Sequence, residues 1–393
     1  TPMGMTPGAA RRRRQKSRKD RGLLPALLNI EVVESDTGDI LYAVHGTSAA
    51  LDGLEDKDEL VRTLQRCRCE HLNLSPPATL INWDVTHEEC LNVVGGALPV
   101  IKGNTSEETV AVLKEPMGSQ GKGIFFVSDA EEIHGVIDEH RQRALQEPAV
   151  LDSLIEAKGR IPSWGKSRGT LSRVHSSQQP LEMLLTLPLV LQAEVTPALL
   201  IRGGRKFHIR SYIVALEKLH HDEVLDIFIF NRHEVRVAGV PVSGNEGTRR
   251  DLQQHITNGA LSETSERVLL DEVKELRDLG LQEKLEVFIA EAFGKHLIKD
   301  IERRVYSGIS GDDGTGLDVR KFAVGGLDLM ITEDGSIYLL EVNVNPTAPK
   351  ESTVGESFKE HLRGFLKDFV DLVTGNSPAS FRNVLDVLEQ HGL

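Results

Sequence analysis

Residues 321–346, KFAVGGLDLMITEDGSIYLLEVNVNP, read as two apolar strands joined by a short turn. The Asp334-Gly335 pair at the centre is a strong hairpin signal, because both residue types tolerate the backbone conformations of tight turns. If these two are the loop, Glu333 faces Ser336, and a four-residue loop centred on them gives the same pairing further along the strands. The segment therefore predicts an antiparallel strand pair with a defined register, which constrains the fold more than any other part of the chain.

Counting outward from that turn places Asp328 opposite Glu341 and Gly326, with open space above it, opposite Asn343. Side chains alternate with period two, so Asp328, Glu341 and Asn343 share one face. Opposed carboxylates in apolar strands repel one another and need a cation between them. Two carboxylates and a carboxamide oxygen suit Mg²⁺, which also takes phosphate oxygens and water. The alternative is two acids on the solvent face of an edge hairpin.

A glycine-rich turn lies in LKEPMGSQGKGIFF, residues 113–126. Lys114 ends a predicted strand, and Gln120, Gly121 and Lys122 stand in the turn. Glycines let backbone N–H groups approach phosphate oxygens, and lysines supply positive charge. A strand follows the turn instead of a helix, which excludes the common P-loop pattern. The alternative is an ordinary glycine hairpin with solvated lysines.

The chain has 393 residues, 39% of them apolar, which is enough for two or three compact units. Its most apolar stretch, 183–192, is broken by Pro188 and is too short to cross a bilayer, so no membrane role is expected. Residues 11–21 hold eight basic side chains against Asp20, so the first 22 residues carry +7 and the remainder −20. This arm could bind an acidic polymer, direct nuclear import or be a solvated tail. No motif for specific nucleic-acid binding accompanies it.

Three cysteines, Cys67, Cys69 and Cys90, are too few for a disulfide scaffold in a chain of this length. They favour a reducing compartment, and a cytoplasmic location is expected. The CRCEH stretch has no second ligand pair at zinc spacing, so structural thiols are the better interpretation.

The chain is expected to divide into five parts. They are a basic arm at 1–22, an N-terminal α/β subdomain at 23–100, a central subdomain at 101–195 with a basic loop at 158–179, a C-terminal subdomain at 196–375 and a tail at 376–393. Helices are predicted within 56–72, 129–140, 265–305 and 356–373, with Asp129 as an N-cap, and strands within 110–116, 123–128, 187–195, 206–216, 224–230 and 322–343.

The order of these pieces resembles the ATP-grasp fold and, within it, the tubulin-tyrosine ligase-like family. The pieces are LKEPMGSQGKGI, LVLQAEV, LLIRGGRKFHIRSYIV, NRHEVRVA, HITN, GGLDLM and YLLEVNVNP, spread from about residue 110 to 350. The resemblance implies an α/β (α+β) architecture of antiparallel sheets with flanking helices. It also implies a nucleotide held between the central and C-terminal subdomains.

The resemblance further implies roles for individual residues. Lys206 and Arg210 would be catalytic, Arg236 would bind the amino-acid substrate, and the magnesium ligands would be the hairpin trio. The implied ATP-binding residues are Lys114, Gln120, Gly121, Lys122, Gln192, Ala193, Glu194, Val195, Lys206, His208, Thr257 and Asn258. Within this set, residues 192–195 would form the adenine hinge.

Four departures from the family pattern stand in this chain. Ala193 and Glu194 replace a basic residue and a tyrosine in the hinge, and His208 replaces an acid in K-F-D-x-R. An Arg-Gly-Gly entry at 202–204 stands where Asp-Gly is typical, and Gly259 stands where many members have an aromatic residue. The departures imply either altered substrate choice or lost activity.

The resemblance implies an ATP- and Mg²⁺-dependent ligase that joins a free amino acid, tyrosine, glutamate or glycine, to a protein through an acylphosphate. The acceptor would be tubulin or another protein with an acidic tail, in the cytoplasm and in association with the cytoskeleton. The alternative is a catalytically impaired relative that binds microtubules or chromatin. A ligase for small metabolites lacks support from the K-F-x-x-R and H-x-T-N pieces.

Overall fold

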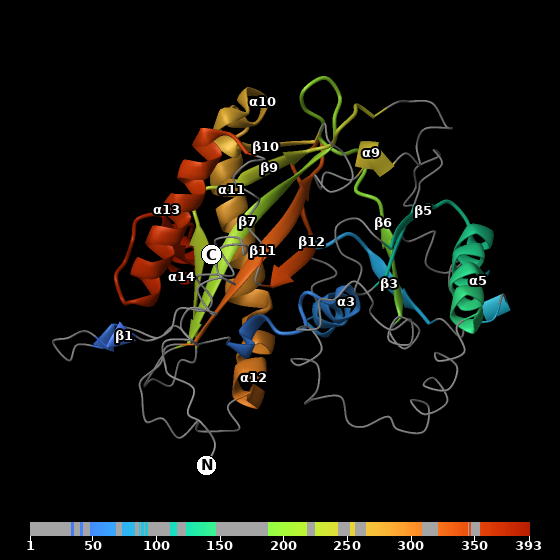
Figure 1. Ribbon diagram of the computed structural model, residues 1–393, viewed down its shortest axis with the longest axis horizontal. Coiled ribbons are helices and arrows are strands. Elements are labelled where there is room, and N and C mark those ends of the chain that lie inside the picture. The colour runs from blue at the N-terminus through green and yellow to red at the C-terminus, as the bar shows by residue number, and fades with distance from the viewer. Residues whose placement is uncertain are drawn as a thin grey trace, which may run out of the picture.

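The computed structural model describes residues 33–34, 40–41, 48–67, 73–82, 86, 88–89, 91–92, 111–115, 123–146, 188–217, 225–242, 252–255, 265–308, 321–344, 346 and 354–393. Two antiparallel sheets organise these residues, and helices flank both of them (Figure 1). The mixed α/β architecture expected from the sequence is confirmed.

The larger sheet has seven strands within the described residues, in the order β10-β9-β7-β11-β12, with β8 paired to β7 and β13 paired to β8. Their bounds are β7 Phe207–Glu217, β8 Leu225–Phe230, β9 Glu234–Val237, β10 Glu266–Leu269, β11 Phe322–Ile331, β12 Ile337–Val344 and β13 Phe381–Asn383. β7 and β11 form the centre, and residues 207–216 of β7 are all buried. They are apolar on one face and partly charged on the other.

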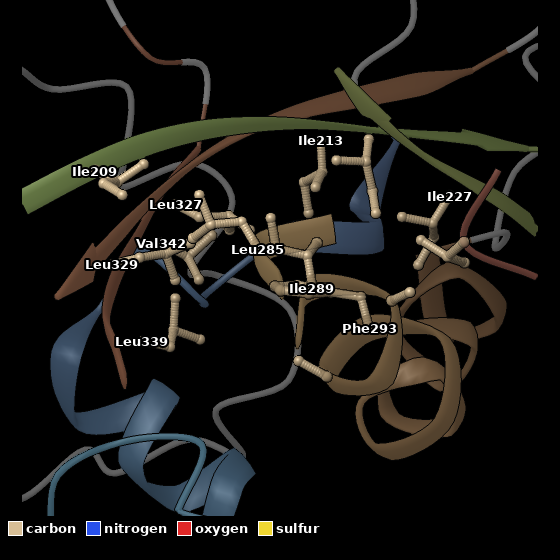
Figure 2. Packing of buried hydrophobic residues seen from close by; sticks show 14 of the residues in the cluster. Ile209, Ile213, Ile227, Leu285, Ile289, Phe293, Leu327, Leu329, Leu339 and Val342 are labelled. Atoms are coloured by element: carbon tan, nitrogen blue, oxygen red, sulfur yellow. The ribbon is translucent and has the colours of Figure 1, made fainter. Parts of the chain in front are cut away.

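One face of this sheet packs against a layer of helices (Figure 2). The layer contains α11 Leu281–Ala290, the π-helical turn η5 Glu291–His296, α12 Ile298–Gly308 and α14 Val384–Gln390. Leu285, Ile289 and Phe293 of this layer meet the inward side chains of the sheet. Those side chains include Ile209, Ile213, Ile227, Leu327, Leu329, Leu339 and Val342. Alternation along the strands therefore gives this face a continuous apolar core.

The opposite face is divided in two. At one end α13, Glu356–Val373, packs its aromatic stripe onto the sheet, with the Phe365 ring 5.1 Å from the Tyr212 ring and the Phe369 ring 5.0 Å from that of Phe322. At the other end the same face carries Arg210 and His208, two and four residues before Tyr212 on β7. The site is built on this charged end.

The smaller sheet has the order β3-β6-β4-β5 and is backed by α5, Ala130–Gln146. Its strands are β3 Ala78–Ile81, β4 Ala111–Lys114, β5 Ile124–Val127 and β6 Leu189–Ala193. Asp129 accepts a hydrogen bond from the Glu132 amide at 2.9 Å, which confirms the predicted N-cap of α5.

Short elements complete the described chain. They are β1 Val33–Glu34 paired with β2 Ile40–Leu41, η1 Ala49–Leu51, α3 Lys57–Arg66, α9 Leu252–His255, η4 Leu270–Glu272 and α10 Lys274–Arg277. α3 lies between the two sheets and contacts β3, β6 and β12 (Figure 1). None of the helices in the described part of the chain is long and apolar enough to span a bilayer.

Three expectations about organisation need correction. The region 265–305 does not begin as a helix, because residues 266–269 form β10 and add an edge strand to β9. The N-terminal region does not stand apart, since Leu51 and Leu60 join the core of the larger sheet and β3 pairs with β6. The segment 376–393 is no tail, because β13 and α14 belong to the larger sheet and its helical layer. In each case long-range pairing outweighs local sequence pattern.

Candidate active site

The β11–β12 hairpin has the predicted pairing at the site. Asp328 lies opposite Glu341 and Gly326 opposite Asn343, which confirms the register expected from the sequence. The role of these side chains in metal binding stays a prediction.

The turn of this hairpin differs from the expected one. Thr332 and Ser336 pair around a three-residue loop, with Gly335 at φ +85°, so the predicted pair of Glu333 with Ser336 is wrong. A β-bulge at Leu340 then adds one residue to β12, because Leu329 faces Leu339 while Asp328 faces Glu341. The observed turn shifts the strand pairing by one residue from the predicted register, and the bulge shifts it back by one residue. Asp328 therefore still lies opposite Glu341.

The side chains of the trio converge. The Asn343 side-chain nitrogen is 3.3 Å from Asp328 Oδ2 and 3.1 Å from Glu341 Oε1. Asp328 is 4% exposed, whereas Glu341 and Asn343 are half-buried. Rotation of the Asn343 amide would exchange its nitrogen for its oxygen at the same place. The trio can therefore present two carboxylates and one amide oxygen to a common point.

Two basic side chains of β7 lie against Asp328. Arg210 donates two hydrogen bonds to it, Nε to Oδ1 at 2.5 Å and Nη2 to Oδ2 at 2.9 Å, and His208 Nε2 lies 3.4 Å from Oδ1. Burial alone would raise the pKa of Asp328, but Arg210 and His208 hold it well below its usual range. The carboxylate is thus ionised at neutral pH.

The expected open space at Gly326 is occupied. A Cβ added at this glycine would lie 2.8 Å from Arg210 Nη1 and 3.1 Å from Pro346 Cβ. Glycine is needed here because the guanidinium group of Arg210 lies directly over the strand.

Lys57 is a site residue that the sequence did not single out. It begins α3, is 7% exposed, and its Nζ lies 3.9 Å from Glu341 Oε2. The nearest signal in the sequence is the acidic start of this helix, DKDEL, which predicts a helix and no contact with a hairpin almost 300 residues away.

Lys114 brings the smaller sheet to the hairpin. It ends β4, and its Nζ donates to Gln192 Oε1 of β6 at 2.5 Å. Burial lowers the pKa of Lys114 to about 8, and the negative charges of Glu341 and Asp328 oppose that effect. Two predicted nucleotide contacts, Lys114 and Gln192, thus lie together and within electrostatic reach of the predicted metal ligands.

Lys206, immediately before β7, belongs to a second cluster of polar side chains. Its Nζ donates to Glu194 and lies 2.9 Å from His255 Nδ1, and the His255 ring packs at a tilt against Phe126 with ring centroids 4.3 Å apart. Burial would raise the pKa of Glu194, but His255 and Lys206 lower it. Glu194, one of the departures from the family pattern, is therefore an ionised carboxylate that forms an ion pair with Lys206. Its neighbours Ala193 and Val195 are buried.

Arg236 lies on β9 in register with His208. One of its terminal nitrogens donates to Glu234 Oε2 at 3.2 Å, and Glu234 also accepts from the Tyr212 hydroxyl at 2.6 Å. Burial raises the pKa of Glu234, but Arg236 and Tyr212 shift it below its usual value. Arg236 therefore lies on the charged face of the sheet, two strands from the metal trio.

Five predicted nucleotide-binding residues lie outside the described residues: Gln120, Gly121, Lys122, Thr257 and Asn258. The departure at Gly259, the basic arm 1–22 and the basic loop 158–179 do so as well. These predictions are left untested.

The donor set fits Mg²⁺ in chemistry. Two carboxylates and an amide oxygen are hard ligands, and Mg²⁺ commonly takes one or two carboxylates together with phosphate oxygens and water. Within the described residues no group of three or more His, Cys, Asp and Glu side chains could hold a metal ion, so phosphate and water would have to supply the remaining ligands. Arg210 would share Asp328 with the ion.

Two antiparallel sheets with flanking helices, and Lys114 of the smaller sheet within electrostatic reach of Asp328 and Glu341 on the larger one, are consistent with the ATP-grasp fold. The family model described as the tubulin-tyrosine ligase family matches residues 97–376, most of the chain. The protein belongs to the tubulin-tyrosine ligase family. Membership supports ATP-dependent ligase activity on proteins as its class of function.

Proposed function

We propose that this protein is an ATP-dependent carboxylate–amine ligase that adds tyrosine, glutamate or glycine to a protein through an acylphosphate. The nucleotide would lie between the smaller sheet and the charged face of the larger one. The observation that carries this proposal is the convergence of Asp328, Glu341 and Asn343 with Lys114, which comes from the other sheet.

The reaction needs charge stabilisation more than a nucleophilic side chain. A carboxylate oxygen of one substrate attacks the γ-phosphorus of ATP, and ADP leaves. The amine nitrogen of the other substrate then attacks the acyl carbon, loses a proton and expels phosphate. Lys114, Lys206 and Arg210 would hold the phosphates and offset the charge that develops on them.

Asp328, Glu341 and Asn343 would hold Mg²⁺, which when bound would neutralise phosphate charge. Lys206 must exchange Glu194 for a phosphate oxygen, since its ammonium group now donates to that carboxylate. His208 and Arg210 keep Asp328 ionised, and Lys57 lies beside Glu341. Gln192 positions the ammonium group of Lys114.

Tubulin, or another protein with an acidic tail, is the acceptor we propose. The family match supports a protein acceptor, and the basic stretches at 11–21 and 158–173 could attract an acidic tail by charge. A cytoplasmic, cytoskeleton-associated location is part of the same proposal.

The test is to incubate the purified protein with Mg-ATP, tubulin and each labelled amino acid in turn, and to measure incorporation into tubulin. We expect incorporation of one amino acid, abolished by Glu341→Gln. Glu333→Gln is the matched control, because Glu333 is exposed on the turn of the same hairpin. No nucleotide binding together with no incorporation would contradict the ligase proposal.

A second candidate is an impaired relative that binds microtubules or chromatin without transfer. The contact of Glu194 with Lys206 favours it, because this acid neutralises a predicted phosphate-binding lysine. Nucleotide binding with no transfer of any amino acid, and restored transfer in Glu194→Gln, would support this candidate.

A further inference from the structure

Two arginines face each other at the edge of the larger sheet. Arg236 of β9 is in register with Arg267 of β10, and on its other side Arg236 is in register with His208 of β7. Alternation places all three on the charged face, since Val235 and Val268, their neighbours in sequence, pack on the opposite core. A row of basic residues thus extends from the active site to the sheet edge.

Arg236 is buried without full hydrogen bonding. It is 4% exposed, and its Nε has no hydrogen-bond partner in the described part of the chain. A buried polar group without a partner is costly, and a guanidinium group more so. The Nε–H group of Arg236 therefore lacks an acceptor among the described residues.

Arg267 is half-buried, and among the described residues no carboxylate is hydrogen-bonded to it. Burial lowers the pKa of Arg267, and the charge of Arg236 lowers it further. Like charges directly opposite each other on two strands are destabilising. The pair is thus an unfavourable arrangement in the absence of an anion.

Glu234 balances only part of this charge. It already accepts hydrogen bonds from Tyr212 and Arg236, and it is in register with Arg210. Asp328, the next acid on this face, is occupied by Arg210. An anion with more than one carboxylate would supply what both arginines lack.

We infer that the amino acid taken by this site is dicarboxylic, of the glutamate class, with its α-carboxylate and side-chain carboxylate shared between Arg236 and Arg267. The inference rests on the proposed ligase function and selects among its amino acids. Adjacent strands are about 4.8 Å apart, so one small molecule can reach both side chains. Bidentate guanidinium–carboxylate pairs are strong and directional.

The alternatives fit less well. Glycine has one carboxylate and would leave one arginine without a partner. Tyrosine likewise has one carboxylate and would leave one arginine without a partner. A glutamate residue within the acceptor chain offers the same chemistry, but Arg236 is almost fully buried, which favours a small free molecule. The amide-forming step is unchanged, because the free amine still displaces phosphate from the acylphosphate.

The experiment measures binding directly and needs no acceptor. The full chain is loaded with a non-hydrolysable ATP analogue and Mg²⁺ and titrated calorimetrically with glutamate, aspartate, glutamine, glycine and tyrosine. An N-acetylated tetraglutamate peptide is a further ligand that stands for the acceptor. We expect glutamate to bind best and glutamine, its neutral isostere, at least about tenfold more weakly.

Arg267→Gln is the decisive variant. It should weaken glutamate binding about 10- to 100-fold and leave the affinities for glycine and for the ATP analogue unchanged. Arg267→Lys should weaken glutamate binding by an intermediate factor, because lysine keeps the positive charge but cannot donate two parallel hydrogen bonds to a carboxylate. Arg277→Gln is the matched control, since Arg277 is exposed on α10. A thermal melt of each variant establishes that it is folded.

Equal binding of glutamate and glutamine, or glutamate binding unaffected by Arg267→Gln, would overturn the inference and leave the ligase proposal intact. Tighter binding of the peptide than of free glutamate, with the same dependence on Arg267, would also overturn it. Failure of the unmodified protein to bind the ATP analogue would contradict the proposed function itself.

Discussion

The charged face of the larger sheet holds two regions that differ in their balance of charge. On the β11–β12 hairpin, Asp328 and Glu341 are met by Arg210, His208 and Lys57. At the β9–β10 edge, two arginines oppose each other, and among the described residues only Arg236 is hydrogen-bonded to a carboxylate, that of Glu234. The charges of the hairpin region are therefore largely balanced, whereas the β9–β10 edge carries an excess of positive charge.

The largest effect is expected on protein stability, from a substitution in the charge-balanced β11–β12 hairpin. Asp328→Asn keeps the shape of the side chain and leaves Arg210 buried without its counter-charge, so stability should fall by about 3–5 kcal/mol. Urea unfolding followed by circular dichroism measures this change. Glu333→Gln on the exposed turn should stay within about 0.5 kcal/mol of the parent. A loss below about 1 kcal/mol for Asp328→Asn would show that the ion pair is not a buried one.

Gly325 and Gly326 are neighbours on β11 but face opposite sides of the sheet, so substituting each one tests a different side. A Cβ at Gly325 would lie 2.9 Å from Leu51 in the core, and a Cβ at Gly326 would lie 2.8 Å from Arg210 in the site. Gly325→Ala should cost about 1–3 kcal/mol of stability with normal activity in the folded protein. Gly326→Ala should reduce transfer by displacing Arg210. Unfolding curves measure the stability of each variant, and initial rates measure its activity. Loss of activity in Gly325→Ala with loss of stability alone in Gly326→Ala would show that the two glycines face the opposite sides from those described.

The lowered pKa of Lys114 leads us to expect that nucleotide binding depends on pH. Its pKa is about 8, so it is mostly protonated at pH 7.5 and mostly neutral at pH 9. Because the protonated form binds phosphate, affinity for ATP should fall by up to about tenfold over this range. Lys114→Gln should remove that part of the slope, whereas Lys274→Gln, on exposed α10, should preserve it. Calorimetry at both pH values is the measurement.

The smallest effect is expected at the unbalanced edge. Arg267→Gln removes a like charge opposite Arg236, so the ligand-free protein should become more stable by about 0.2–1 kcal/mol. Urea unfolding without ligand tests this, with Arg277→Gln as the control. A loss of more than about 1 kcal/mol would show that Arg267 has a structural counter-charge.

Much of the site's geometry was predictable because it depends on local regularity. The period of two along β12 places Glu341 and Asn343 on one face, and the Asp334-Gly335 turn sets the partner strand. The bulge at Leu340 was not predictable, since its cause is the core: Leu339 and Val342 both face inward although they are three residues apart. The correct pairing depended on a turn and a bulge that offset one another.

Other site residues gave no local signal. Lys57 is the first residue of an ordinary amphipathic helix, and Arg267 belongs to a segment whose pattern favoured a helix. Each became part of the site through a contact with a distant element, β12 for Lys57 and β9 for Arg267. Glu194 was identified as a departure, but its contact with Lys206 came only from the fold.

The amino-acid sequence by itself determined strands β4 to β8, β11 and β12, the helix α13 and the pairing of Asp328 with Glu341, because side-chain periodicity and turn residues act over a few positions. Only the tertiary structure decided which charges are balanced. Counter-charges come from segments far apart in the chain, and burial, which makes an unpaired charge costly, exists only once those segments pack together.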